Sequence, residues 1–334
     1  MKIAYFYQEP WEEEYIRAAL PDAEIAFYAG ALEGGSSAGD ADVEALSIFV
    51  NSEIGDAALA RFPELKLIAT RSTGFDHIDI AAAKKRGVVV SNVPFYGENT
   101  VAEFTFALLL SLSRKIETAH RRVVETGAFS QEGLRGFDLA GKTIGIVGGG
   151  HIGVRVARIA RGFEMKVLVI DVHADEELAR ETGFSYVSLD EILAHSDIVT
   201  LHVPYNEHTH HLLNRESIKK MKRGSYLINT ARGAVVETGA LVEALAAGTL
   251  AGAALDVLEE EGDLSDELKL LGGPHPKADV LATMLANHYL IRHPRVIVTP
   301  HVAFNTAEAI MRILDVTIQN IKAFSRNTPE NIVS

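Results

Sequence analysis

Cysteine is absent from the 334-residue chain. Its absence excludes disulfide bonds, thiolate metal ligands and a cysteine nucleophile. Basic residues are also in the minority, because 32 Lys and Arg stand against 45 Asp and Glu, for a formal net charge of −13. A negative field of this size disfavours binding to nucleic acid and to anionic membranes. An anionic substrate would need local arginine or backbone donors.

Long apolar runs are missing too. The longest lies between Phe104 and Leu112 and is far too short to span a bilayer. The segment Met1–Tyr7 is too short and too aromatic for a signal peptide. We therefore expect no membrane association and a cytoplasmic location. The length of 334 residues predicts about two domains, each able to bury its own core.

Short apolar, β-branched runs alternate with helical patterns along the chain, which predicts an α/β fold with parallel sheets. In the first part of the chain the expected strands are Lys2–Tyr7, Glu24–Tyr28, Leu46–Asn51, Leu65–Thr70 and Val88–Asn92. A second set begins near Lys142 and comprises residues 143–147, 166–170, 198–203, 225–229, 252–257 and 296–299.

Helical patterns fall between these runs, at Glu12–Leu20, Ile78–Arg86 and Val280–Leu290. The pair Thr100 and Glu103 has the spacing of a capping box before an apolar helix that we expect to run to about Glu125. The last helix, Asn305–Phe324, is expected to return to the first domain.

Three glycines mark the turn after the strand 143–147. Gly148, Gly150 and Gly153 give the spacing G-x-G-x-x-G before an apolar helical pattern. The first glycine permits a tight turn, the second lets backbone approach a pyrophosphate, and the third lets the helix pack closely on the sheet. Asp171 ends the next strand, about 20 residues on, where a carboxylate binds a ribose and repels a 2′-phosphate. The pattern predicts NAD as the cofactor, not NADP.

Ligands of open α/β sheets lie beyond the carboxyl ends of the strands, so polar residues there are candidates for chemistry. Arg232 could grip a carboxylate with two parallel hydrogen bonds or be a surface arginine. His301 is one of 13 histidines, and a lone histidine is usually a surface or satisfied core residue. Glu261 ends the run Glu259–Glu261, which by itself predicts a solvated acidic turn. Position alone leaves these alternatives open.

Another cluster is the group His208, His210 and His211, with His202 nearby. We interpret it as solvated and predict no metal site, because no acidic ligand stands at helical spacing to complete one.

Several motifs follow one another in a family-specific order. They are the glycine turn, Leu201–Pro204, Asn229–Gly233, Leu255–Glu261 and Thr299–His301, preceded by Arg71–Asp79 and Asn92–Pro94. In this order the chain resembles the D-isomer-specific 2-hydroxyacid dehydrogenases over nearly its whole length. Tyr96 and the long excursion between Glu261 and His301 make the D-lactate dehydrogenases the most similar branch.

The resemblance implies two Rossmann-like or flavodoxin-like domains, with an NAD-binding domain of residues 99–299 inserted into a substrate domain of residues 1–98 and 300–334. Arg232 would bind the substrate carboxylate and polarise the keto group. His301 would be the acid/base, with Glu261 as its carboxylate partner. Thr73, Gly74, Tyr96 and Phe304 would also contact the substrate. The cofactor would be bound by Gly148, Gly150, His151, Ile152, Gly153, Asp171, His202, Val203, Pro204, Thr230, Ala231 and Asp256.

The expected reaction is reduction of pyruvate to D-lactate with NADH. A glyoxylate or hydroxypyruvate reductase would use the same chemistry, phosphite oxidation uses a related scaffold, and an NAD-sensing, corepressor-like binding protein would be no enzyme at all. The helix region 99–125 carries more apolar residues than one face needs, as in a core helix or a helix that meets a second subunit. We expect a homodimer through this region and a small 2-oxo or 2-hydroxy acid as the substrate.

Overall fold

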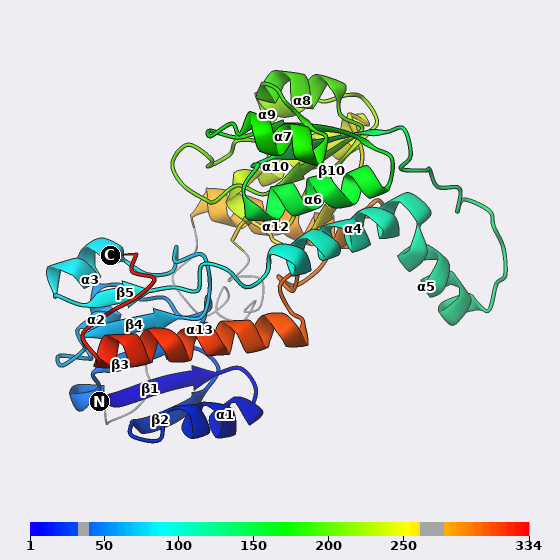
Figure 1. Ribbon diagram of the computed structural model, residues 1–334. Coiled ribbons are helices and arrows are strands. Elements are labelled where there is room, and N and C mark those ends of the chain that lie inside the picture. The colour runs from blue at the N-terminus through cyan, green and yellow to red at the C-terminus, as the bar shows by residue number, and fades with distance from the viewer. Residues whose placement is uncertain (33–39, 261–276, 334) are drawn as a thin grey trace. The chain divides into compact units, whose positions relative to one another are not determined.

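The protein is described by a computed structural model that covers residues 1–32, 40–260 and 277–333. The chain folds into two compact units, coloured along the sequence in Figure 1. Unit 1 comprises Met1–Tyr96 and Thr306–Ser334, and unit 2 comprises Gly97–Asn305. Unit 2 is therefore inserted into the sequence of unit 1. Both sheets are parallel throughout, which confirms the predicted fold class.

Unit 1 contains a five-stranded sheet in the order β2-β1-β3-β4-β5. Its strands are β1 (Lys2–Tyr7), β2 (Glu24–Ala29), β3 (Ala45–Ile48), β4 (Leu67–Thr70) and β5 (Val89–Ser91). Its helices are α1 (Trp11–Ala19), the short η1 (Asp40–Asp42), α2 (Asp56–Leu59), α3 (Ile80–Lys85) and α13 (Ala307–Ser325). The order 2-1-3-4-5 is that of flavodoxin-like sheets.

Helices cover both faces of the unit 1 sheet. On one face, Ile16 of α1 and Leu314 and Ile318 of α13 pack on Ile3 and Tyr5. On the other, Leu59 of α2 and Ala83 of α3 pack on the sheet. The last helix thus belongs to unit 1. Its N-cap is Thr306, whose side-chain oxygen accepts a hydrogen bond from the Ala309 N–H.

Unit 2 contains a seven-stranded sheet in the order β12-β11-β10-β9-β6-β7-β8. The strands are β6 (Thr143–Val147), β7 (Lys166–Ile170), β8 (Ser185–Tyr186), β9 (Ile198–Leu201), β10 (Ser225–Asn229), β11 (Leu250–Leu255) and β12 (Val296–Val298). The strand order reverses between β6 and β9, the point where doubly wound sheets bind dinucleotides. The two-residue strand β8 was missed by the sequence prediction.

The helices of unit 2 form two layers around its sheet (Figure 1). They are α4 (Glu98–Arg114), α5 (Ile116–Thr126), α6 (His151–Gly162), α7 (Glu176–Thr182), α8 (Leu189–His195), α9 (Arg215–Lys219), η2 (Gly233–Val235), α10 (Thr238–Ala247) and α12 (Ala278–Arg292). Residues of α4, α6 and α7 share one core with the sheet, and residues of α8, α9, α10 and α12 share the other.

The helical region 99–125 differs from its prediction in two ways. The capping box was wrong, because α4 already begins at Glu98 after Gly97, which places Thr100 and Glu103 inside the helix. The single helix to Glu125 was also wrong, because Lys115 adopts a left-handed conformation (φ 53°) that ends α4 and starts α5.

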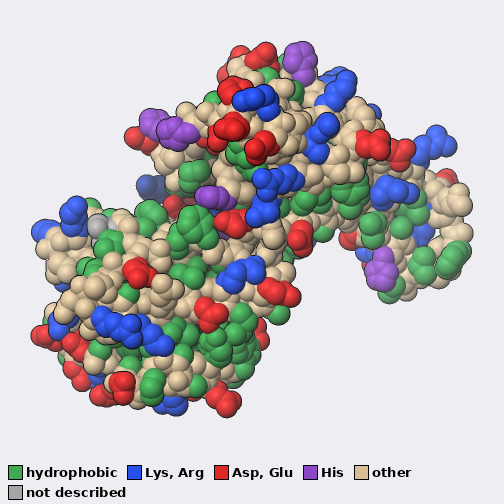
Figure 2. Space-filling model, in the orientation of Figure 1, with side chains coloured by type: hydrophobic (Ala, Val, Ile, Leu, Met, Phe, Trp, Pro, Cys, Tyr) green, Lys and Arg blue, Asp and Glu red, His purple; other side chains and the backbone are tan. Residues whose placement is uncertain are grey.

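The apolar surplus of this region divides between the two helices. Phe106, Leu108 and Leu109 of α4 are buried in the core of unit 2. Helix α5, in contrast, has no buried residue. It projects from the rest of its unit (Figure 1), and hydrophobic side chains gather along it in Figure 2. Within the part of the chain that the structure describes, no helix is both long and apolar enough to cross a membrane.

Candidate active site

The glycine turn joins β6 to α6, and each glycine meets a different environment. Gly148 has φ +102°, and a Cβ there would lie 2.5 Å from the carbonyl oxygen of His202. A Cβ at Gly153 would lie 1.9 Å from the carbonyl oxygen of Gly148, whereas one at Gly150 would have no neighbour within 4 Å. The first and third glycines therefore close the turn and seat the helix, as predicted. The second borders open space at the N-terminus of α6.

That helix start is suited to an anion. Gly150 is the N-cap residue of α6, and no side chain caps this end of the helix, which lies wholly within the described residues. The first turn also contains no acidic residue. The N–H groups of a helix start and the positive end of the helix dipole suit a phosphate. His151 and Ile152, both predicted to contact the cofactor, are the first two residues of this turn.

Asp171, directly after β7, is tied to the glycine turn. Its Oδ2 accepts a hydrogen bond from the Gly149 N–H at 2.7 Å. Its Oδ1 accepts one from the His173 N–H at 2.9 Å. These two bonds fix the carboxylate beside the turn, and each oxygen retains a lone pair for a hydroxyl donor.

His202 follows β9. Its carbonyl oxygen lies against the glycine turn, 2.5 Å from where a Cβ of Gly148 would be. Its Nε2 lies 2.9 Å from the Thr200 hydroxyl, and its Nδ1 is buried. Burial lowers the pKa of His202 to about 3, so the ring is neutral at physiological pH. Val203, the next residue, packs against the core, and Pro204 is exposed.

Arg232 lies in the loop after β10, and hydrogen bonds between side chains and backbone fix this loop. The Asn229 side chain accepts a hydrogen bond from the Ala231 N–H at 3.0 Å and donates one to the Arg232 carbonyl at 2.9 Å. The Arg232 Nη1 donates to the Ala231 carbonyl at 2.8 Å. The Thr230 hydroxyl lies 3.2 Å from that of Thr105 on α4. The loop is therefore anchored on both sides of the guanidinium.

His301 lies in the turn after β12, and Asp256 organises that turn. The Asp256 carboxylate accepts hydrogen bonds from the Thr299 hydroxyl at 2.6 Å and from the N–H groups of Val302 and Ala303 at 3.0 and 2.8 Å. The His301 N–H donates to the Asp256 carbonyl at 2.8 Å, and His301 has φ +52°. Burial raises the pKa of Asp256. We expected Asp256 to contact the cofactor, but its carboxylate, in a residue only 1% exposed, holds this turn.

These loops form a continuous set at one edge of the sheet. β11 lies between β10 and β12, so their carboxyl ends are neighbours. The Asp256 N–H donates to the Asn229 carbonyl at 2.9 Å, which joins the Arg232 loop to the residue that holds the His301 turn. Phe304, half-buried, ends the same turn. The structure thus places the predicted carboxylate binder and the predicted acid/base in two loops of one unit, and both loops are linked to Asp256.

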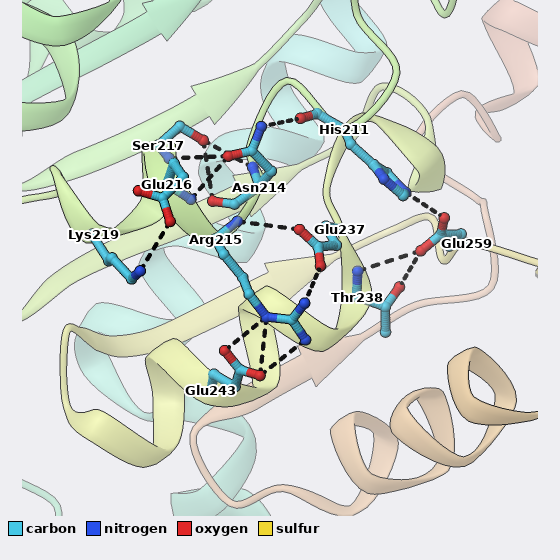
Figure 3. A network of polar contacts seen from close by, with 10 residues as sticks. All are labelled: His211, Asn214, Arg215, Glu216, Ser217, Lys219, Glu237, Thr238, Glu243 and Glu259. Atoms are coloured by element: carbon cyan, nitrogen blue, oxygen red, sulfur yellow. Dashed lines mark hydrogen bonds and ion pairs between the residues drawn. The ribbon is translucent and has the colours of Figure 1, made fainter. Parts of the chain in front are cut away.

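Glu259, the first residue of the acidic run after β11, is not solvated as the sequence predicted. Glu259 is largely buried and accepts hydrogen bonds from His211 Nε2 at 2.6 Å and from the Thr238 hydroxyl at 2.8 Å (Figure 3). His211 therefore has a structural partner, and its ring stacks on His210 with 3.9 Å between the ring centroids. Glu261 lies outside the described residues.

The predicted substrate loop of unit 1 follows β4. The Asn92 side chain donates to the Thr73 carbonyl at 2.8 Å, and the Thr73 hydroxyl donates to the Val93 carbonyl at 2.8 Å. The Ser72 hydroxyl donates to the Gly74 carbonyl at 2.6 Å. Tyr96, at the end of the first segment of unit 1, accepts a hydrogen bond on its carbonyl from Arg312 of α13 at 2.8 Å.

Residues 106–303 match the family model of the D-isomer specific 2-hydroxyacid dehydrogenases, NAD binding domain. The chain belongs to this family. The match includes the glycine turn, the Arg232 loop and His301, and it makes the protein an NAD-dependent oxidoreductase.

Individual members of the dehydrogenase family are similar over most of the chain. A 2-hydroxyacid dehydrogenase homolog from Zymomonas mobilis is 41% identical over 283 residues, 84% of this chain and 83% of the relative. A glyoxylate reductase from Thermofilum pendens is 40% identical over 279 residues, 82% of this chain and 75% of that protein. The structure of D-lactate dehydrogenase from Aquifex aeolicus, complexed with NAD and lactic acid, is similar with a TM-score of 0.88 and 38% identity, covering 99% of this chain and 98% of that one.

Proposed function

We propose that this dehydrogenase reduces pyruvate to D-lactate with NADH. The observation that carries the proposal is that the loops of Arg232 and His301 lie at the same edge of one sheet and are both linked to Asp256, the first through Asn229. It is supported by the similarity, over nearly the whole chain, to a D-lactate dehydrogenase of known structure.

The cofactor residues fit NAD. The open space at Gly150 leaves room for a pyrophosphate at the N-terminus of α6. Asp171 is held beside that turn as an acceptor for the ribose hydroxyls, and its negative charge would repel a 2′-phosphate. Neutral His202 adds no charge to the site. Thr230 and Ala231 would contact the cofactor from the next loop.

In the proposed reaction the bound NADH supplies the hydride to C2 of the oxo acid. Arg232 binds the substrate carboxylate through its planar fork and stabilises the negative charge that develops on the keto oxygen. His301 donates a proton to that oxygen as the alkoxide forms. Glu261 is proposed as the carboxylate partner of His301. In the reverse direction His301 removes the hydroxyl proton of D-lactate.

We propose that unit 1 is the substrate domain. The backbone N–H groups of Thr73 and Gly74 would bind the substrate carboxylate, and Tyr96 would line the pocket. In unit 2, Phe304 would supply an apolar wall. The hydrogen bonds that fix the loop at Thr73 support this role, because a substrate loop must hold its donors in place.

Kinetics of two variants test the assignment. His301→Ala should lose on the order of 10²–10⁴ in turnover, the usual scale for removal of a general acid–base group, while still binding NADH. Arg232→Lys should also fail, because a point charge cannot reproduce the bidentate fork. Wild-type turnover numbers in either variant would reject the roles given to these residues.

Glyoxylate is the second candidate substrate, because a glyoxylate reductase is 40% identical to this chain. The values of kcat/KM for pyruvate, glyoxylate, hydroxypyruvate and phenylpyruvate, measured side by side with NADH, distinguish the candidates. Highest specificity for glyoxylate would replace D-lactate formation as the proposed activity. NADH binding without consumption on any of the four acids would favour a sensing role instead.

We also propose that the protein forms a homodimer through the helical region 99–125, with α5 as its exposed part. Ile116, Val123 and Val124 of α5 are 54%, 40% and 69% exposed, and Phe129 is 96% exposed. Apolar side chains that gather at a projecting helix favour association with a second copy. Sedimentation should show a dimer for the wild type and a monomer for Val124→Asp. A monomeric wild type would reject the interface.

A further inference from the structure

Glu259 is a largely buried acid that the proposed reaction does not use. Its carboxylate accepts hydrogen bonds from three donors: His211 Nε2 at 2.6 Å, the Thr238 hydroxyl at 2.8 Å and the Thr238 N–H at 3.3 Å. The last donor is the first residue of α10, where the helix dipole favours a negative charge. Only 14% of the Glu259 side chain is exposed.

The backbone around Glu259 is equally constrained. A Cβ at Gly233 would lie 2.0 Å from the Leu258 carbonyl carbon and 2.3 Å from the Glu259 nitrogen, so the loop of Arg232 rests directly on this backbone. On the other side, the fully buried Asn287 of α12 donates to the Glu259 carbonyl at 2.6 Å. Glu259 is thereby held between α12 and the residue that follows Arg232.

His211 also binds the loop that follows Arg232. Its N–H donates to the Ala234 carbonyl at 2.8 Å, two residues beyond Arg232. Next to it, Leu213 forms a parallel bridge with Val236. The segment from Gly233 to Thr238 is therefore bound to the backbone of His211 and to the side chain of Glu259. The side chains of His211 and Glu259 also bind each other (Figure 3).

We propose that Glu259 and His211 are positioning residues for Arg232. Together they hold the segment after Arg232 on two sides and so fix where the guanidinium meets the substrate carboxylate. The inference deepens the proposed function and rests on it, because it assumes that Arg232 binds a 2-oxo acid. Misplacement of a binding group by about 1 Å can cost about 10²-fold in rate.

Glu259→Gln tests the proposal with the 2-oxo acid that the wild type reduces best. We expect the KM for the oxo acid to rise and kcat/KM to fall by about 10²-fold. The Kd for NADH should change much less than this KM, because Glu259 and His211 hold the segment after Arg232, whereas Thr230 and Ala231 precede it and the glycine turn lies at β6. A purely structural role would lower the melting temperature and the active fraction, but leave the KM for the oxo acid unchanged.

Two further variants make the test decisive. His211→Gln, at the partly exposed end of the pair, should raise the same KM. The KM of the double variant should be no higher than that of Glu259→Gln alone, because both changes break the same contact. Glu243→Gln is the matched control, because Glu243 pairs with Arg215 in the same network but does not contact Glu259 (Figure 3).

The outcomes separate this inference from the proposed function. Turnover by the wild type, with an unchanged oxo-acid KM in both Glu259→Gln and His211→Gln, would overturn the positioning role alone. If Glu259→Gln does not fold, His211→Gln decides. A wild type that binds NADH but reduces no oxo acid would overturn the proposed function, and the positioning role with it.

Discussion

Unit 1 and unit 2 each use a buried carboxylate to hold a strand-end loop, but they compensate its charge differently. In unit 1, Glu12 pairs with the buried guanidinium of Arg71 and accepts hydrogen bonds from the Tyr5 hydroxyl and the N–H groups of Gln8 and Glu9. In unit 2, Asp256 has hydroxyl and backbone N–H donors around its carboxylate.

The difference decides what happens when a partner is lost. A buried ion pair is costly to assemble, and removal of one member leaves an uncompensated charge. A carboxylate bound by neutral donors leaves only unsatisfied N–H and O–H groups when it is removed. Burial also raises the pKa of Asp256. Loss of a partner should therefore destabilise the loop that begins at Arg71 in unit 1 more than the turn that Asp256 holds in unit 2.

The largest effect is expected for Glu12→Ala. This change leaves Arg71, which is 2% exposed, without its carboxylate and should lower the free energy of unfolding by about 3–5 kcal/mol. Denaturant unfolding measures the loss. Replacing the pair together, as Glu12→Leu with Arg71→Met, should recover most of it, because no charge is then buried. A loss no greater for Glu12→Ala than for the double variant would mean that an uncompensated Arg71 charge does not destabilise unit 1.

Asp256→Ala should cost less, about 1–3 kcal/mol, because it leaves neutral donors of the Thr299–Ala303 turn unsatisfied. Its pH dependence has a definite sign. The folded state binds the Asp256 proton more tightly than the unfolded state, so this group's contribution is full below the ordinary pKa of 3.8 and is lost as pH rises through the raised value. Asp256→Asn, compared with wild type by chemical denaturation from pH 3 upward, should lack that decline.

His202 is a third case, because its ring carries a buried Nδ1 and burial is the one cause of its lowered pKa. The folded state resists protonation, so its stability is full above the ordinary pKa of 6.5 and is lost as pH falls toward about 3. The slope due to this one group is at most about 1.4 kcal/mol per pH unit. His202→Gln should flatten the stability profile over that window. An unchanged profile would show that the ring is solvated.

The smallest effect is expected for the ion pair between Arg215 and Glu243, whose side chains are 53% and 60% exposed. Water and salt screen such a pair, so a double-mutant cycle should give no measurable coupling in the unfolding midpoint. A coupling as large as the loss in Glu12→Ala would mean that burial is not what distinguishes the two kinds of pair.

The sequence predicted most of the strands, because each is a short apolar run between turn residues. β1, β6, β7 and β10 have the predicted bounds. β8 has only two residues, Ser185 and Tyr186, and pairs with β7 alone, so it carries no periodicity to detect. The break at Lys115 was equally invisible, since a lysine gives no signal for a left-handed conformation.

The candidate site was predictable as a set of strand ends, but not as a network. Arg232 and His301 follow the carboxyl ends of β10 and β12, which the parallel sheet places at the same edge, and the order of the motifs along the chain predicted both residues. The partnership of Glu259 with His211 joins residues 48 positions apart, in segments whose compositions predict solvated loops. Likewise, the inward direction of Asp256 depends on the turn at Thr299 to Ala303, 43 to 47 positions away. Local patterns carry no information on such contacts.

The bond between Asp171 and the Gly149 N–H bears on any redesign toward NADP. Replacement of Asp171 would remove the proposed repulsion of a 2′-phosphate and, at the same time, the acceptor of the hydrogen bond from the Gly149 N–H. A change of coenzyme preference made at this position would therefore weaken binding of both dinucleotides. Val172, 92% exposed directly beside it, offers a place for an arginine that leaves the turn intact.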